Sequence, residues 1–397
     1  MTLHIFNPEH DIALASGKMY FTAPHAGRQL RNDLGWIPAL WAAPNDYVLV
    51  NDVGHAEKSF LRLLAATKSQ YVTDVSRCRF VTSPLLLSTD TTPYSADHMA
   101  NLEFKIKPWG WDASLKTQLS RMGIADSLLP SDKDIDYIRR SSHRKKSAEL
   151  LNFLHAQIDE NAKDLSGYSN LIIGKAKECK TPHEVFELSD EWKYIVVKAP
   201  WSSSGRGIRF VKGDWSVTMK GWLKNTIATQ GSVMVEPYYN KVMDFGMEFS
   251  SDGKGNVSYL GLSLFHTQNG AYTGNLLATE SRKQQELSHY LSPSLLNRIQ
   301  TIICQGISTI MEHYEGPFGV DMMIVSATKG QADIECTDRE SHPFLLNPCV
   351  EINLRHTMGH VALSLNKLIN PQNDDEIVKV MRIVYEDKQY KLKLQFI

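Results

Sequence analysis

The feature that most constrains the fold is a short apolar segment, residues 194–198, that ends on a lysine and runs directly into serines and glycines. Its letters, YIVVK, favour a buried strand because they are rich in β-branched and aromatic residues. Consecutive Ser and Gly residues let backbone N–H groups converge on phosphate oxygens, and a lysine at the strand end adds a positive charge. The segment predicts a phosphate-binding turn, with a surface hairpin and polar turn as the alternative.

The predicted phosphate turn does not follow the commonest nucleotide motifs. Neither G-x-x-x-x-G-K-[ST] nor G-x-G-x-x-G occurs in the chain. The predicted cradle instead consists of Lys198, Ser202, Ser203, Ser204, Gly205 and Gly207.

Composition excludes several classes of protein. The 43 Lys and Arg residues nearly balance the 44 Asp and Glu residues, so no overall basic surplus favours nucleic acid or an anionic membrane as partner. No run of about 18 apolar residues predicts a membrane span. Five cysteines without a C-x-x-C pair argue against a disulfide framework or a zinc site. Because His10 and Asp11 interrupt the region where a signal peptide needs an apolar core, we expect a cytoplasmic protein.

Residues 1–140 alternate between strand and helix patterns. Residues 3–6, 47–50 and 102–108 are typical of strands, and residues 56–67 and 112–123 are typical of helices, the second with Asp112 as its N-cap. This alternation predicts a Rossmann-like α/β domain with a mainly parallel sheet. Pro130 and Ser131, followed by a basic helix near residue 142, mark its expected end.

The rest of the chain mixes strands and helices. We expect a helix and then a strand over 183–198, strands over 231–239, 257–267, 318–325 and 349–354, helices over 292–314 and 374–387, and an edge strand over 388–397.

Carboxylates occur on two of these expected strands. Asp321 lies within an apolar run, and Glu351 and Asn353 are two residues apart, followed by Arg355. Alternate residues of a strand point to one face. Because a buried carboxylate needs a partner, oxygen atoms from two strands predict a Mg²⁺ site beside nucleotide phosphates. In the alternative, Glu351 pairs with Arg355 and Asp321 caps a turn.

Together these segments resemble the ATP-grasp superfamily. The matching pieces are VVKAPWSSSGRGI, VMVEPYYNKVMDFGMEF, GPFGVDMMIV and VEINLR, in that order. The resemblance implies an α/β and α+β protein with a small subdomain over 141–230, which carries the phosphate loop, and a C-terminal subdomain over 231–397, which carries the Mg²⁺ site.

The resemblance also implies roles for single residues. ATP phosphates would contact Lys198, the loop residues Ser203, Ser204, Gly205 and Gly207, and Lys145, with Arg144 or Lys146 as alternatives to Lys145. Glu236 would lie at the hinge, with Val235, Pro237 and Tyr238 beside the adenine, and either Asp244 or Glu248 would reach the ribose or phosphates. Asp321, Glu351 and Asn353 would hold Mg²⁺, for which Mn²⁺ could substitute.

The implied activity is that of an ATP-dependent ligase. A substrate carboxylate becomes an acyl phosphate, and an amine or thiol then displaces the phosphate. Many such ligases carry an arginine where this chain has Gly319, so Arg355 or Arg282 is the candidate for stabilising negative charge. The alternatives are an ATP-grasp phosphotransferase acting on a small molecule and a non-catalytic nucleotide-binding regulatory domain.

The expected partners are small-molecule carboxylate and amine substrates, with neither nucleic acid nor membrane, and a homodimer is common in this family. We expect Lys198→Ala to weaken ATP use without disturbing the fold, because a site lysine that is exposed contributes little to the core.

Overall fold

The structure is a computed structural model that describes residues 1–67, 78–83, 104–160, 169–202, 207–268, 271–327, 343–370 and 378–396. The chain forms two compact units. Unit 1 comprises Met1–Arg140, Thr273–Thr279 and Arg355–Ile397, and unit 2 comprises Ser141–Tyr272 and Glu280–Leu354. This division differs from the expected consecutive segments 1–140, 141–230 and 231–397, because the C-terminal residues pack with the N-terminal ones.

Unit 1 begins with alternating strands and helices. Its elements up to residue 141 are β1 (Thr2–Ile5), α1 (His10–Ser16), α2 (His25–Leu34), η1 (Ile37–Leu40), β2 (Tyr47–Leu49), α3 (Val53–Thr67), β3 (Arg79–Val81), β4 (Lys105–Pro108), α5 (Ala113–Arg121), η4 (Asp126–Leu128) and α6 (Asp132–Ser141). The later elements are the end of β11 (Ala271–Leu277), α13 (Met358–Ile369), β14 (Lys379–Glu386) and β15 (Gln389–Phe396).

The four N-terminal strands form an all-parallel sheet in the order β3-β2-β1-β4, as the alternation predicts. Leu3 and Ile5 of β1 pack with helix α5, whereas Val48 of β2 packs with α3, so separate apolar clusters cover the sheet. The predicted N-cap of α5 is confirmed, because Asp112 Oδ1 accepts a hydrogen bond of 2.9 Å from the backbone N–H of Leu115.

The prediction of a helix over 374–387 is wrong. The segment contains β14, which pairs antiparallel with β11 and with β15; residues 374–377 lie outside the described ranges. Met381 and Leu392 are buried in the cluster that also contains Trp36 and Val361. Strand pairing and this burial override the helical spacing, in a segment whose β-branched residues suit a strand.

Unit 2 contains two antiparallel sheets. Its elements are α7 (Lys145–Glu160), η5 (Ser169–Leu171), β5 (Lys177–Cys179), α9 (Pro182–Trp192), β6 (Tyr194–Lys198), β7 (Ile208–Lys212), α10 (Val217–Gln230), β8 (Val233–Pro237), β9 (Lys241–Asp252), β10 (Val257–Gln268), the start of β11, α11 (Glu280–Ser288), α12 (Pro293–Ile310), β12 (Glu315–Ser326) and β13 (Phe344–Asn353).

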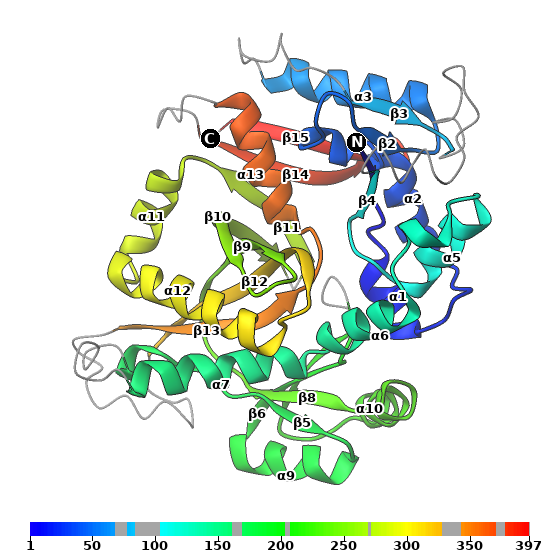
Figure 1. The fold of residues 1–397 in the computed structure, drawn as a ribbon. Helices are drawn as coiled ribbons and strands as arrows, with labels where there is room; N and C mark the ends of the chain where they lie inside the picture. The colour runs from blue at the N-terminus through cyan, green and yellow to red at the C-terminus, as the bar shows by residue number, and fades with distance from the viewer. Residues whose placement is uncertain are drawn as a thin grey trace. The chain divides into compact units, whose positions relative to one another are not determined.

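The small sheet has the order β5-β8-β6-β7, and α9 and α10 cover one of its faces (Figure 1). Ile195, Val197 and Val235 point into the core beneath these helices. Because successive strand residues alternate between faces, Lys198 and Glu236 lie on the opposite face.

The large sheet of unit 2 includes the neighbouring strands β13-β12-β9-β10. One of its faces is apolar, where Phe249 and Phe318 stack with ring centroids 5.1 Å apart and both are fully buried. Helices α7 and α12 pack against each other and against strands of this sheet. Across the described ranges, no helix has the length and hydropathy that a bilayer crossing requires.

Candidate functional site

Lys198 and Glu236 form a largely buried ion pair on the face of the small sheet opposite α9 and α10. Val196 of β6 is paired with Glu236 of β8, which places Lys198 and Glu236 on the same face. Lys198 Nζ lies 2.6 Å from Glu236 Oε1 and 2.7 Å from Oε2. The expectation of an exposed lysine is wrong, since only 6% of Lys198 is exposed. The positive charge at the end of β6 is therefore balanced by the carboxylate of Glu236.

The three predicted metal ligands lie together on the large sheet. Asp321 on β12 is directly opposite Glu351 on β13, and Asn353 is opposite Gly319. These residues share one face of the sheet, and Asn353 Nδ2 donates to Asp321 Oδ2 at 3.1 Å. A register shift follows the Asp321–Glu351 pair, where β13 contains Pro348, and such irregularities redirect side chains near functional sites.

Gly246 on β9 keeps space beside Asp321. It is paired with Asp321 across the sheet, and a Cβ atom at this position would lie 3.2 Å from the Val320 carbonyl oxygen and 3.4 Å from Asp321 Oδ1. Sequence reasoning missed Gly246, although an isolated glycine in a strand pattern signals a close approach.

Arg144 connects the two sheets of unit 2. It precedes α7, is 6% exposed, and its Nη2 lies 2.7 Å from Glu351 Oε1. Its Nη1 donates to the Ala199 carbonyl oxygen and to Ser202 Oγ, both at 2.7 Å. The end of β6 and the predicted metal strand therefore share one guanidinium group. The sequence had offered Arg144 only as an alternative to Lys145.

The buried thiol of Cys349, on β13, lies near these charges. Burial raises the pKa of Cys349 well above its usual value, Glu236 and Asp321 raise it further, and Lys198 opposes them. A single thiol thus lies within electrostatic range of groups from both sheets. No sequence pattern had singled out Cys349.

The donor set fits Mg²⁺. Asp321, Glu351 and Asn353 offer two carboxylates and an amide, which are the hard oxygen ligands that Mg²⁺ prefers. Among the described residues, no group of three or more His, Cys, Asp or Glu side chains gathers to hold a metal ion.

Asp244 and Glu248 differ in their surroundings. Asp244 Oδ2 receives Lys241 Nζ at 2.5 Å and Thr267 Oγ1 at 2.6 Å. Glu248 is 3% exposed and lies opposite Gly319, in the same cross-strand row as Asn353. Glu248 thus shares a cross-strand row with Asn353, whereas Asp244 lies opposite Met323 and contacts Lys241 and Thr267.

Tyr238 lies at the end of β8 in an aromatic group. Its ring stacks on Tyr194 with centroids 3.8 Å apart, and Phe210, half exposed, meets it edge-on at 6.1 Å. Val235 points into the opposite core. Tyr238, and not Val235, therefore remains the residue predicted to flank the adenine.

Only part of the predicted phosphate turn is described. Ser203, Ser204 and Gly205 lie outside the described residues. Gly207 is described: its carbonyl oxygen accepts from the Ala199 N–H at 2.8 Å, and a Cβ there would clash with Ser202 Cβ. Only glycine fits this contact.

Three other predicted residues have the following contacts. Arg355 follows the end of β13, belongs to unit 1, and pairs with Asp11 there through Nη2 at 2.8 Å. Arg282 pairs with Glu286 on its own helix at 2.8 Å. Lys145 begins α7 and is half-buried, and its backbone N–H donates to His143 Nδ1.

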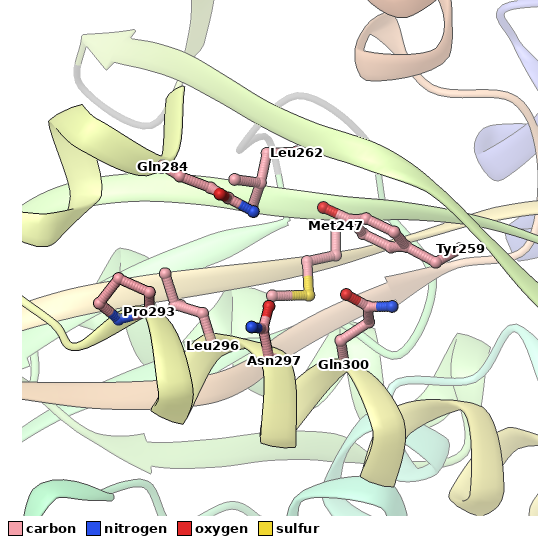
Figure 2. A pocket seen from close by; sticks show the side chains of 8 residues that line it. All are labelled: Met247, Tyr259, Leu262, Gln284, Pro293, Leu296, Asn297 and Gln300. Atoms are coloured by element: carbon pink, nitrogen blue, oxygen red, sulfur yellow. The ribbon is translucent and has the colours of Figure 1, made fainter. Parts of the chain in front are cut away.

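A small pocket lies on the apolar side of the large sheet. Figure 2 shows Met247, Tyr259 and Leu262 of the strands facing Pro293, Leu296, Asn297 and Gln300 of α12, and Gln284 of α11 also lines the pocket. Its volume of about 10 Å³ is the room of a single water molecule, so it is too small for a substrate.

Comparisons with known proteins give distant structural likenesses. No protein-family model and no curated protein matches the sequence. Biotin carboxylase from Campylobacter jejuni, solved as a β,γ-ATP complex, has a TM-score of 0.49 at 13% identity, over 97% of this chain and 76% of that one.

Two further solved structures are similar at about the same level. N5-carboxyaminoimidazole ribonucleotide synthetase from Thermus thermophilus has a TM-score of 0.46 at 10% identity, over 98% of this chain and 84% of that one. N5-carboxyaminoimidazole synthetase from Staphylococcus aureus, solved with ADP, has a TM-score of 0.45 at 10% identity, over 98% and 83%. Likenesses this distant do not define a function for this chain. The function must be inferred from the chain's own residues.

Proposed function

We propose that the chain is an ATP-grasp ligase that uses ATP and Mg²⁺ to activate a carboxylate and join it to an amine or thiol. The observation that carries this proposal is the convergence in unit 2 of Lys198, Glu236, Arg144, Asp321, Glu351 and Asn353. Two cations and a hard-oxygen donor set, drawn from two sheets, are what a metal–triphosphate complex needs. The parallel order of the unit 1 sheet supports a Rossmann-like N-terminal domain.

The nucleotide would lie against the face of the small sheet that carries Lys198 and Glu236. Lys198 would contact its phosphates as a point charge, with Glu236 fixing the position of Nζ. Tyr238 would border the base, and Glu248 would face the ribose or phosphates. Asp321, Glu351 and Asn353 would hold Mg²⁺, which neutralises phosphate charge when bound.

The residues of this chain act by positioning rather than as nucleophiles. A substrate carboxylate oxygen attacks the γ-phosphorus of ATP, the bond to the β–γ bridging oxygen breaks, and ADP leaves. The amine or thiol then attacks the acyl carbon and phosphate departs. Holding the reactants in line and stabilising charge accounts for most catalysis of this kind. Arg355 and Arg282 remain the proposed charge-stabilising residues, with Lys145 as a proposed further phosphate contact.

The proposed substrates are small molecules, and we propose a homodimer in the cytoplasm. The four cysteines among the described residues are free thiols, which supports a reducing compartment.

A co-substrate screen tests the function. Purified protein with Mg-ATP is supplied with pairs of amino acids, peptides and small carboxylates, and ADP release is measured. We expect release only when both co-substrates are present, and loss of release in Asn353→Ala. Equal ATP consumption by Asn353→Ala and wild type would contradict the proposal.

Gly319 favours a second candidate, a phosphotransferase, because the position where many such ligases carry an arginine holds no side chain. Mass spectrometry separates the two: a phosphorylated small molecule as the final product would favour phosphotransfer, and a ligated product would favour the ligase.

A further inference from the structure

Arg144 forms an ion pair with Glu351, one of the proposed metal ligands. The guanidinium divides its donors: Nη2 goes to Glu351 Oε1, and Nη1 goes to the Ala199 carbonyl oxygen and Ser202 Oγ, each at 2.7 Å. A planar guanidinium with several fixed donors can serve such separate partners at once, and a lysine ammonium cannot keep the same geometry.

The ion pair changes what a free cation meets at the site. With Arg144 in contact, the charge of Glu351 is already neutralised. A cation that binds Glu351 must displace the guanidinium or lie beside a like charge, and both are costly at these separations. Arg144 therefore opposes the binding of a metal ion to Glu351 when no nucleotide is present.

A nucleotide would change that balance. A triphosphate offers oxygen acceptors that suit a guanidinium at least as well as a carboxylate does. The anchors at Ala199 and Ser202 would keep Arg144 at the end of β6, beside Lys198, after it leaves Glu351. Arg144 Nε is buried without a hydrogen-bond partner within the part of the chain that the structure describes, so the guanidinium retains an unused donor.

We propose that Arg144 competes with the divalent cation for Glu351, so that metal and nucleotide bind cooperatively and free metal binds weakly. The proposal rests on the proposed function, because it assumes that unit 2 binds a metal–triphosphate complex. Cooperative binding of this kind is a coupling between two ligands and is reciprocal.

The test is Mn²⁺ binding to the intact chain, measured by electron paramagnetic resonance with and without a non-hydrolysable ATP analogue. Wild type should bind Mn²⁺ weakly alone and much more tightly with the analogue. Arg144→Gln should bind free Mn²⁺ roughly tenfold more tightly than wild type, because the neighbouring positive charge is removed. Its coupling between metal and analogue should fall by a similar factor.

Arg140→Gln is the matched control, because Arg140 pairs with Asp136 on an exposed helical surface. It should leave both affinities unchanged. Arg144→Lys, which keeps the charge but not the fork, should lie between Arg144→Gln and wild type.

Free Mn²⁺ affinity in Arg144→Gln that is equal to or weaker than that of wild type overturns the inference while leaving the proposed function intact. A wild-type protein that binds neither the analogue nor its Mn²⁺ complex overturns both. If Arg144→Gln does not fold, the wild-type Arg144 Nε–H NMR resonance decides: it should shift when Mg²⁺ and the analogue are added together, and an unchanged resonance counts against the proposal.

Discussion

His356 of unit 1 and the ion pairs of unit 2 are enclosed ionisable groups in two different states. In unit 1, His356 stacks on Trp41 with centroids 4.6 Å apart and lies near Trp109, and burial lowers its pKa well below 6.5. In unit 2, Lys198 and Arg144 stay beside carboxylates as ion pairs.

A neutral enclosed histidine and a buried ion pair contribute differently to stability. A neutral histidine between tryptophans adds packing, and its ionisation is avoided. A buried ion pair is seldom the most stable choice, since apolar residues of similar volume are often as good. We infer that the pairs of unit 2 are kept for a charged ligand.

Lys198→Met should have the largest effect and would break the pairing in unit 2. ATP-dependent turnover should fall by about 10²–10³-fold, as when one charge-stabilising donor is removed from an active site. Stability should fall by about 3 kcal/mol or more, because Glu236 is left buried and unpaired.

The double variant Lys198→Met/Glu236→Gln separates these two effects. Chemical denaturation should show most of the stability restored, while turnover stays low. Turnover that recovers along with stability would show that the pair is only structural.

Phe249→Ala probes the apolar face of the same large sheet. Phe249 is fully buried and stacks on Phe318, so its truncation should cost about 3–5 kcal/mol in the free energy of unfolding. Turnover per folded molecule should stay close to that of wild type. A selective loss of nucleotide affinity in the folded variant would argue against the separation of faces.

Asp321→Asn tests the donor set with a smaller expected change. The substitution keeps the size of the side chain and its contact with Asn353 but removes one charge. The Mg²⁺ concentration for half-maximal turnover should rise by about tenfold, because Mg²⁺ prefers carboxylate oxygens. An unchanged Mg²⁺ requirement would remove Asp321 from the proposed site.

The smallest expected effect is a pH dependence that arises in unit 1. The unfolded chain takes up a proton at His356 near its ordinary pKa of 6.5, whereas the folded chain does so only at much lower pH. Acid therefore favours unfolding: the contribution is complete above about pH 6.5 and declines as the pH falls below it. His4 acts in the same direction, since burial also lowers its pKa.

Hydrogen exchange at pH 5 and pH 7 measures this effect. Amides of β1 should lose protection at pH 5 more than amides of β9, and His356→Phe should reduce the difference. Equal losses in both strands would contradict the contrast between the units.

Structural features that depend on neighbouring residues, such as a helix cap or the face of a strand, could be predicted from the sequence. Asp112 caps its helix as predicted, and Asp321, Glu351 and Asn353 share a face because strand residues alternate. Such features depend on neighbours in sequence, or on one pairing of adjacent strands.

Features that depend on distant partners could not be predicted. The burial of Lys198 follows from Glu236, 38 residues away, and the role of Arg144 follows from Glu351, 207 residues away. The spacing over 374–387 indicates a helix, but the pairing of β14 with β11 and β15 overrides it. Tertiary contacts decide such cases, and a single sequence does not contain them explicitly.

The most direct measurement is calorimetric titration of the intact chain with a non-hydrolysable ATP analogue, with and without Mg²⁺. The account predicts one nucleotide per chain, tight only with Mg²⁺, and little binding to the Lys198→Met/Glu236→Gln variant. A folded wild-type protein that takes up no nucleotide under either condition, or a double variant that binds as tightly as wild type, would contradict it.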